Sequence, residues 1–437
     1  MRFNKREMTI NICCFLILFY IFNISIVGKV FFKDEIATSI LILSVVILIL
    51  TGKIIRLRKY QLYVLLTIIV AIGMELFNNF YFKEGRPGNA LKYTIMLFFP
   101  FIMVVNEQTV NSFFKFLKFF CVEHILGTMF VQFFKDAYIN VLLPWMSNGI
   151  HWMAEENFLQ GYNPGLTSHY SMNGMYLSFA IIYFFSQFLS KKEKKYIFWT
   201  FLAILAILFN AKRGPLIFSI MSCMVMYLFY NKEKMTNKIF KGSIILLLGI
   251  VSILIISSFV PQILNVVDRF EKAFETGNFL NGREDFYDLA KELWKDSILF
   301  GNGWGAFSYY FQEYLYDVGY GVEYLDAHNV YLQLLCETGL FGFLFYVVIM
   351  ITSFVETIKS ISQVNDSFNE LQLYFSLGYQ TFFILYCFSG NPLYDIQCYA
   401  IYFICIGISI KNYIYRKYMI KNGENNESRV NNIYTNI

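Results

Sequence analysis

The sequence predicts an all-α polytopic membrane protein with about twelve transmembrane helices and one large external loop that contains short helices. Of its 437 residues, 57% are hydrophobic and only 15% are charged, and the mean hydropathy is +0.49. This composition is too apolar for an ordinary water-soluble domain. Runs of about 20 apolar residues, the length that crosses a bilayer as a helix, recur along the whole chain. Alternate loops also differ in their content of Lys and Arg.

Twelve apolar runs define the expected spans. They cover residues 8–28, 36–52, 60–82, 91–106, 115–134, 169–189, 196–211, 214–231, 243–261, 335–355, 371–390 and 396–411. The first run follows Arg2, Lys5 and Arg6 as a signal sequence would. It is too long for a signal core and has no small-residue cleavage site near Val27, so we expect it to be retained.

The distribution of basic residues sets the expected orientation. With a cytoplasmic N-terminus, 23 Lys and Arg fall in cytoplasmic segments and 13 in external ones. Five of the 13 lie in the long loop, where the positive-inside rule has little weight, so the useful comparison is 23 against 8. Both termini are therefore expected in the cytoplasm. The net charge of +5 follows from this bias, which argues against nucleic-acid binding.

The spans divide the chain into four parts. Helices one to nine occupy residues 1–260, the large external loop 261–329, helices ten to twelve 330–415, and a cytoplasmic tail, expected to be disordered, 416–437. The external loop carries twelve acids and five bases, together with helix-like and Gly-rich stretches. We therefore expect it to fold over the membrane surface.

Several chemistries lack a sequence signal. All eight cysteines lie in or beside apolar runs, where cysteine acts as a small hydrophobe, and the external loops offer no disulfide framework. No Cys-x-x-Cys, Walker or GxGxxG pattern occurs. We therefore expect no metal and no cofactor.

Two arginines are candidate functional residues at the expected outer surface. Arg213, in Asn210-Ala-Lys-Arg-Gly-Pro215, is expected to end a short helix before a Gly-Pro break. The alternative is a snorkelling side chain that anchors the helix end. Arg283 opens a stretch with helical apolar spacing that runs to Phe300. The alternative for Arg283 is half of a surface ion pair.

His328 is the third candidate, because it directly precedes an expected helix on the external side. An imidazole titrates near pH ~6.5 and can take a proton from an attacking hydroxyl. The alternative is a structural histidine that caps the Asn329-Val330 turn. Packing roles are expected for the other histidines, His124, His151 and His169.

Three further residues are auxiliary candidates for substrate binding. Arg86 and Lys212 are expected outer-face cations. Glu337 lies nine residues beyond His328 inside an apolar run, and intramembrane acids are functional candidates by default. The nearby Gly301-Asn-Gly-Trp-Gly305 segment follows no strand, so we interpret it as a shaping turn and not as a phosphate loop.

Three consecutive blocks carry a family resemblance. Residues 282–294, 298–307 and 327–342 contain an Arg, a downstream Trp, a Gly-x-Gly turn, and a His-Asn-x-x-Leu segment that ends in Glu-x-Gly-x-x-Gly. This pattern resembles the O-antigen ligase and Wzy-type polysaccharide polymerase superfamily. The Arg followed by Gly after ten intervening residues, found in some polymerases, is not met at Arg213, Arg269 or Arg283.

The resemblance implies a metal-independent bacterial glycosyltransferase with a GT-C-like membrane fold. Its implied substrate is an undecaprenyl-diphosphate-linked oligosaccharide at the outer leaflet of the cytoplasmic membrane. Arg213, Arg283 and His328 match the catalytic residues of the family. Membrane lipid, a flippase and a chain-length regulator are the implied partners.

The bottom-up chemistry agrees with this expectation. Without a metal, the charge of a diphosphate leaving group must be met by cations, and the arginine fork binds phosphate oxygens in pairs. Arg213 and Arg283 are therefore assigned to the diphosphate, and His328 to the proton of the acceptor hydroxyl. Polymerisation into a capsule or O-antigen type polysaccharide is the first expectation. Ligase-type transfer to another acceptor, a lipid-linked-glycan flippase or transporter, and a non-enzymatic scaffold are the alternatives.

Overall fold

The computed structural model describes residues 5–26, 34–52, 98–105, 107–146, 151–230, 234–258, 268, 271, 275, 283–317, 325–362 and 367–422. Within these ranges all regular secondary structure is helical, in agreement with the predicted fold class. The candidate Arg86 and the expected span 60–82 lie outside the described residues.

The helices of the first half are α1 (Lys5–Phe22), α2 (Ile24–Ile26), α3 (Asp34–Thr51), α6 (Phe99–Val105), α7 (Glu107–Phe133), α8 (Lys135–Ala137), the π-helical turn η2 (Tyr138–Leu142), the 3-10 turn η3 (Leu143–Trp145), α9 (His151–Leu159) and α10 (Tyr170–Lys191). Those of the second half are α11 (Lys194–Asn210), α12 (Arg213–Phe229), α13 (Met235–Ser257), α15 (Glu284–Asp296), α16 (Ala306–Asp317), α17 (Val330–Ile361), α18 (Ser367–Tyr386) and α19 (Ile396–Asn422).

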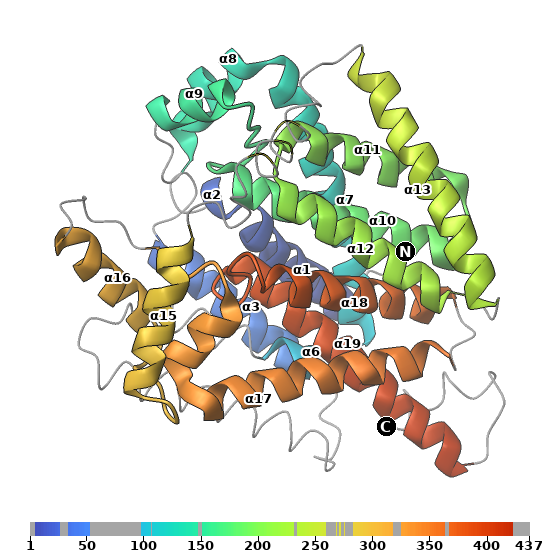
Figure 1. Ribbon diagram of the computed structural model, residues 1–437. Coiled ribbons are helices and arrows are strands. Elements are labelled where there is room, and N and C mark those ends of the chain that lie inside the picture. Colours follow the sequence, from blue (N-terminus) through green and yellow to red (C-terminus); the bar gives the residue numbers. More distant parts are fainter. Residues whose placement is uncertain are drawn as a thin grey trace.

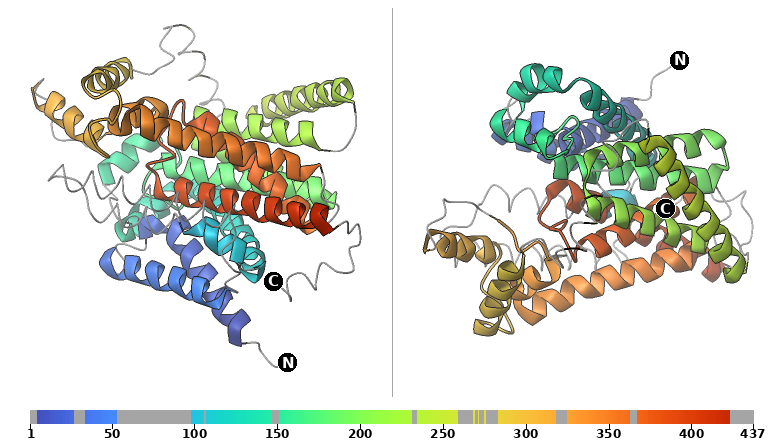
Figure 2. Two further views of the ribbon diagram at one scale, coloured as in Figure 1. Left: turned by 90° about the horizontal axis from the view of Figure 1, so that it is seen from below. Right: turned by 45° about the horizontal axis from the view of Figure 1, so that its top comes forward.

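Helix α10 is the centre of the bundle. It packs against α7, α11, α12 and α18 (Figure 1), and 83% of its most apolar 18-residue window is buried. A helix that is apolar around its whole circumference is expected to be enclosed by other helices. The two further views show the same arrangement of long helices lying side by side (Figure 2).

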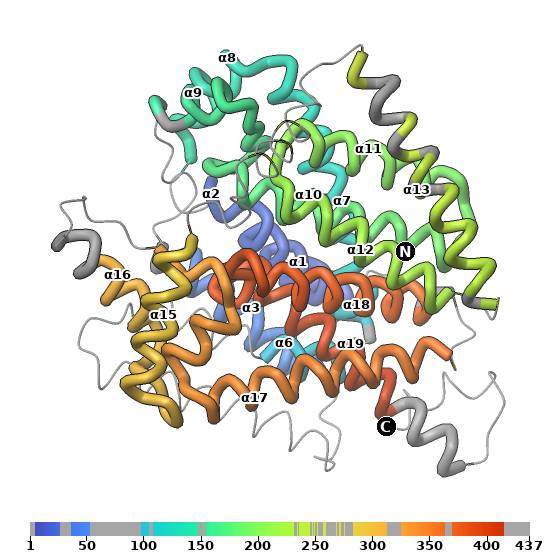
Figure 3. The backbone as a smooth tube through the Cα atoms, viewed as in Figure 1, coloured from blue at the N-terminus to red at the C-terminus, as the bar shows by residue number. Residues whose placement is uncertain are grey.

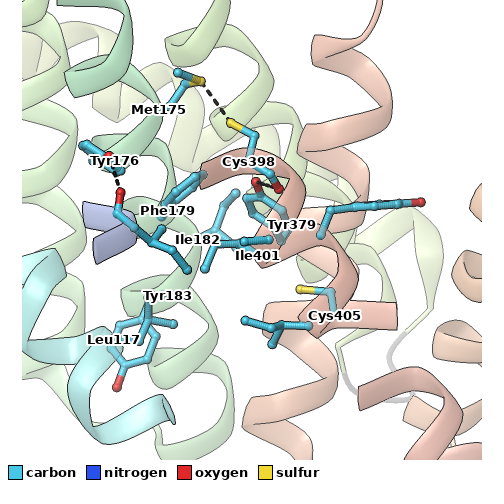
Figure 4. Close-up of a cluster of buried hydrophobic side chains, with 14 of the residues drawn as sticks. Leu117, Met175, Tyr176, Phe179, Ile182, Tyr183, Tyr379, Cys398, Ile401 and Cys405 are labelled. Carbon is cyan, nitrogen blue, oxygen red and sulfur yellow. Dashed lines mark hydrogen bonds between the residues drawn. The ribbon is translucent and has the colours of Figure 1, made fainter. Parts of the chain in front are cut away.

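Aromatic side chains fill the core between α10 and α18 (Figure 4). The rings of Phe179 and Tyr379 meet edge to face at 5.1 Å. The Tyr176 hydroxyl donates to Ile21 O at 2.6 Å, so its polar end is satisfied inside the apolar core. All eight cysteines are unpaired, and seven of them are buried, as expected for small hydrophobic residues.

Among the described helices, three are long and apolar enough to cross a membrane: Gln108–Phe133, Tyr170–Lys191 and Val330–Ile361. Ile36–Thr51 and Arg213–Phe229 are shorter apolar helices. The outer face of α17 exposes an apolar stripe at a spacing of three to four residues, formed by Phe341, Leu344, Val348, Ile351 and Val355. Such a stripe suits contact with lipid. The protein is therefore a multi-pass membrane protein, and the number of twelve spans stays a prediction.

Two helices of the segment predicted as the external loop, α15 and α16, lie at the end of the bundle where α17 begins (Figures 1 and 3). Helix α15 packs on α17, and α15, α16 and the segment before α17 share a small apolar core made of Ala290, Leu293, Phe307, Phe311, Ala327 and Cys336. The helix predicted to run from Arg283 to Phe300 forms, but it ends at Asp296. Residues 297–300 leave the helical path because the carbonyls of Ile298 and Leu299 accept hydrogen bonds from backbone N–H groups of α17.

A kink in α17 explains this pairing. Gly339 has φ +63° and ψ −168°, so it interrupts the helical hydrogen bonds. The freed carbonyls of Cys336 and Glu337 accept hydrogen bonds of 2.9 and 2.8 Å from the backbone N–H groups of Asn302 and Gly303. A Cβ atom at Gly301 would overlap the backbone of Glu337. The Gly-rich segment is thus a shaping turn that satisfies the kinked helix.

Candidate active site

The turn between α18 and α19, residues 387–395, brings the candidate residues together. Ser389 O accepts a hydrogen bond of 2.8 Å from Arg283 Nη1. The amide of Asn391 lies 3.4 Å from His328 Nδ1. The Tyr394 hydroxyl donates to Glu337 Oε2 at 2.7 Å. One short turn therefore contacts the start of α15, the segment before α17, and α17 itself.

The backbone around His328 is held in an unusual conformation. His328 has φ +54°, a left-handed geometry that is costly for a side chain with a Cβ. The preceding Ala327 N–H donates to Gln333 Oε1 at 2.9 Å. The following Asn329 caps α17, because its Oδ1 accepts from the N–H groups of Tyr331 and Leu332. The capping role considered for His328 therefore belongs to Asn329.

The imidazole of His328 is neutral at physiological pH. It is half-buried, and its ring lies nearly parallel to that of Phe286, with the centroids 6.1 Å apart. Burial and the charges of Arg283 and Lys212 lower the pKa of His328 to about 3. A neutral imidazole is the form that can accept a proton.

Arg213 starts a helix, contrary to the prediction that it ends one. Helix α11 ends at Asn210, Ala211 adopts a left-handed conformation with φ +61°, and Arg213 is the first residue of α12. Pro215 fits in the first turn of α12 because its missing N–H has no helical partner there. A Cβ atom at Gly214 would lie 3.6 Å from Ser389 Oγ, so the start of α12 faces the same turn that contacts Arg283.

Lys212 shares its electrostatic environment with both arginines. Burial and the charges of Arg283 and Arg213 lower the pKa of Lys212 to about 8, and the opposite effect of Asp395 is too weak to prevent this. Its Nζ lies 4.8 Å above the ring of Tyr170. The charges of Lys212 and Arg283 thus act on His328, Arg213 acts on Lys212, and the Asp395 carboxyl opposes their effect on Lys212.

His169, for which a packing role was expected, is exposed and lies at the edge of this group. It caps α10 by accepting the Ser171 N–H on Nδ1, and its ring is exposed and stacks on Tyr170 at 4.4 Å. Tyr170 also stacks on Tyr162 at 3.8 Å, beneath the Lys212 ammonium. His124, by contrast, is fully buried, and its Nε2 lies 3.1 Å from Phe22 O.

Glu337 lies in a buried polar network that supports the His328 segment. Its side chain is 0% exposed, and Gln333 Nε2 donates to Glu337 Oε1 at 3.1 Å and to Asp326 Oδ1 at 3.0 Å. Asp326 precedes His328 by two residues. This enclosure favours a structural role for the Glu337 carboxyl over direct contact with a substrate.

Four residues of the 387–395 turn were not among the sequence candidates: Ser389, Asn391, Tyr394 and Asp395. The turn contains no Lys or Arg, and Ser389 acts through its backbone carbonyl, which any residue possesses. The available sequence signal was the Ser-Gly-Asn-Pro turn between two apolar runs, followed by Tyr-Asp directly before a helix.

Within the part of the chain that the structure describes, no group of three or more His, Cys, Asp or Glu side chains is positioned to hold a metal ion. Lys212, Arg213, Arg283 and His328 supply three cationic groups and one imidazole. Clustered guanidinium and ammonium groups bind polyanions, and a neutral imidazole beside them accepts protons.

A comparison with known protein families matches one part of the chain. Residues 198–347 match the family model described as O-antigen ligase, which confirms the resemblance found in the sequence. The match covers about a third of the chain and includes Lys212, Arg213, Arg283, His328 and Glu337, but not the turn that joins them. No curated protein matches the chain.

Proposed function

Because residues 198–347 match the O-antigen ligase family, whose members are glycosyltransferase-like enzymes that act on lipid-linked glycans, we propose that this protein is a polysaccharide polymerase. It joins lipid-diphosphate-linked oligosaccharide repeat units into a surface polysaccharide of the capsule or O-antigen type. The reaction takes place at the outer leaflet of a bacterial cytoplasmic membrane, with both termini in the cytoplasm and undecaprenyl diphosphate as the leaving group.

The observation that carries this proposal is that Arg283 and His328 contact the same short turn, with the charges of Lys212 and Arg213 close by. Like charges that share a half-buried site repel one another in the free protein. A bound diphosphate relieves this repulsion, and the relief favours donor binding. Arg283 has five N–H donors, of which Ser389 O accepts one, so the guanidinium is oriented as well as charged.

In the proposed reaction the acceptor hydroxyl oxygen attacks the anomeric carbon of the donor. The bond from that carbon to the diphosphate oxygen breaks, and its electron pair leaves with the diphosphate. The hydroxyl proton passes to His328, which later releases it to water. Negative charge placed beside the imidazole raises its proton affinity, so donor binding itself strengthens the base.

Ligase-type transfer to a different acceptor is the second candidate, because the matched family is described as O-antigen ligase. The two reactions use the same donor chemistry and differ in the acceptor. A flippase or transporter predicts charges distributed through the bundle centre. The candidate cations instead precede or begin helices, at the start of α12 and α15, which favours an enzyme.

A reconstituted assay tests the proposal. Purified protein in liposomes is given a lipid-diphosphate-linked repeat unit, with and without a chelator, and with or without a second acceptor. A polymerase forms long lipid-linked chains from the repeat unit alone, and the chelator has no effect. A ligase forms a product only with the second acceptor. Movement of the glycan across the bilayer without any new glycosidic bond contradicts both enzymatic readings.

A further inference from the structure

Asn391 has a buried amide whose hydrogen bonding is incomplete. Its side chain is 8% exposed, and Nδ2 lies 3.4 Å from His328 Nδ1. The amide oxygen Oδ1 is buried and has no hydrogen-bond partner among the described residues. A buried amide oxygen without a partner is costly and is rare in folded proteins.

The identity of the amide atom that faces His328 decides which imidazole nitrogen is basic. If Nδ2 donates to Nδ1, the ring proton is on Nε2. The lone pair of Nδ1 is then occupied by the amide, and neither ring nitrogen is free to accept a proton. If Oδ1 faces the ring, Nδ1–H donates to it and Nε2 keeps its lone pair. A half-turn of the amide exchanges the two atoms without moving the backbone.

We infer that Asn391 is a positioning residue that accepts the Nδ1–H of His328 on its Oδ1 and so fixes the tautomer in which Nε2 takes the acceptor proton. This inference rests on the proposed transferase function. It adds a residue outside the matched family region, since that match ends at residue 347.

The backbone on both sides of the contact is fixed. The Asn391 carbonyl accepts the N–H groups of Tyr394 and Asp395 at 2.9 and 3.1 Å, which anchors the turn. The left-handed conformation of His328 is anchored by the bonds of its two chain neighbours, Ala327 and Asn329. Because both backbones are held, the amide and the imidazole are already in place before a substrate binds.

Two of the nearby carboxyl groups, those of Asp326 and Glu337, accept hydrogen bonds from other side chains. Asp326 Oδ1 accepts from Ser308 Oγ and Gln333 Nε2. Glu337 Oε2 accepts from Tyr394, and burial raises the pKa of Asp395 to about 7, which weakens its negative charge at neutral pH. A neutral amide orients the imidazole without adding a negative charge, so the imidazole stays unprotonated among the cations until the donor arrives.

The inference is tested on the full-length protein in lipid nanodiscs by nitrogen NMR of 15N-histidine. The His328 signals are assigned by their loss in His328→Gln. We expect Nδ1 protonated and Nε2 unprotonated in the unsubstituted protein, and a mixture of tautomers in Asn391→Ala. Protonation at Nε2 in the unsubstituted protein overturns the inference. This readout needs no substrate, so it is independent of the proposed activity.

Transfer kinetics supply the second readout. Asn391→Ala is expected to lower kcat by about 10- to 100-fold while the KM for the donor changes less than about twofold, because only the orientation of the base is lost. Asn391→Asp keeps the shape of the side chain and adds a negative charge. It is expected to move the acid limb of the kcat/KM pH profile upward by about one unit or more. An unchanged pH profile in Asn391→Asp overturns the inference.

Gln380→Ala is the matched control. Gln380 is also a buried amide, and it bonds Ser353, Thr357, Ser376 and Ser409 between the bundle helices. Its loss is expected to lower stability and to leave the His328 tautomer and the pH profile unchanged. Equal NMR changes in Gln380→Ala and Asn391→Ala contradict a specific role for Asn391.

Discussion

The Arg283 guanidinium is hydrogen-bonded to Ser389 O, 106 residues later in the chain. This bond of 2.8 Å joins the beginning of α15 to the turn between α18 and α19. Ser389 Oγ lies 3.6 Å from the position of a Cβ on Gly214, so the same turn is close to Arg213. The same short segment therefore lies beside Arg283 and beside Gly214, the residue that follows Arg213.

Arg283→Lys tests the role of the guanidinium. Lysine keeps the charge but cannot bind Ser389 O and a phosphate with one planar group. We expect kcat/KM for the lipid-diphosphate donor to fall by about 100-fold, with little change in thermal unfolding. Lys291→Arg is the control on the same helix, because Lys291 is exposed and pairs with Asp288. Transfer at the normal rate in Arg283→Lys contradicts the assignment of Arg283 to the diphosphate.

His328→Ala tests the general base. We expect the variant to insert and fold, because the Gln333 and Asn329 bonds on either side of position 328 do not involve the imidazole. Chain elongation is expected to be abolished, and lipid-linked single repeats are expected to accumulate in cells. The distribution of polymer lengths on gels and the mass of the lipid-linked intermediates provide the measurement. A normal length distribution removes the proposed role.

The lowered pKa of His328 predicts a loss of stability in acid. An unfolded histidine titrates near pH ~6.5, whereas His328 takes up its proton only near pH 3 in the folded protein. Between these values the unfolded state binds more protons, so stability is full above pH ~6.5 and falls as the pH drops. The expected loss is about 1–2 kcal/mol at pH 5. Thermal unfolding of the protein at pH 7 and pH 5 measures it.

His328→Asn supplies the comparison for this pH dependence. Asparagine does not titrate, and it tolerates the left-handed backbone at this position better than most residues. The difference in unfolding temperature between pH 7 and pH 5 is expected to be smaller in the variant than in the unsubstituted protein. An identical difference in both proteins indicates that His328 is not the responsible group.

The sequence predicted the parts of this site that depend on local pattern. The apolar spacing of Phe286, Leu289 and Leu293 predicted the helix after Arg283, and it forms as α15. The pattern did not predict its end, because Ile298 and Leu299 are fixed by backbone hydrogen bonds to Leu340 and Phe341 of the kinked α17, 42 residues later in the chain. The start of α12 at Arg213 was missed because both Ala211 and Gly214-Pro215 are compatible with a helix boundary.

The contribution of the 387–395 turn to the site could not be predicted from the sequence. Ser389 acts through a backbone carbonyl, and the relation of Asn391 to His328 depends on a contact 63 residues apart. Neither interaction leaves a periodic or charge signal. The position of Arg86, which the sequence suggested as a further cation, lies outside the described residues.

Gly301→Ala tests the Gly-rich turn that hydrogen-bonds to the kinked part of α17. A Cβ at Gly301 would overlap the Glu337 backbone, and the residue also has φ +72°. We expect a loss of more than about 2 kcal/mol of stability, together with reduced transfer, because the turn satisfies the α17 kink behind His328. Gly305→Ala is the matched control: its φ is +87°, but no atom lies within 4 Å of the added Cβ. Equal effects of the two substitutions on unfolding contradict the packing argument.

Lys212→Met separates binding of the donor from chemistry. Methionine keeps most of the apolar stem that lies near Gly174 and Tyr170 and removes only the charge. If Lys212 attracts the diphosphate before and during transfer alike, the KM for the donor rises about tenfold while kcat changes less than about threefold. The KM of the variant should also depend less on salt, because one screened attraction is gone.

Lys191→Met is the control, since Lys191 lies in the last turn of α10, at the end opposite to Tyr170. A fall in kcat at constant KM in Lys212→Met instead indicates that the ammonium acts only in the transition state, and the assignment of Lys212 to donor binding is then wrong.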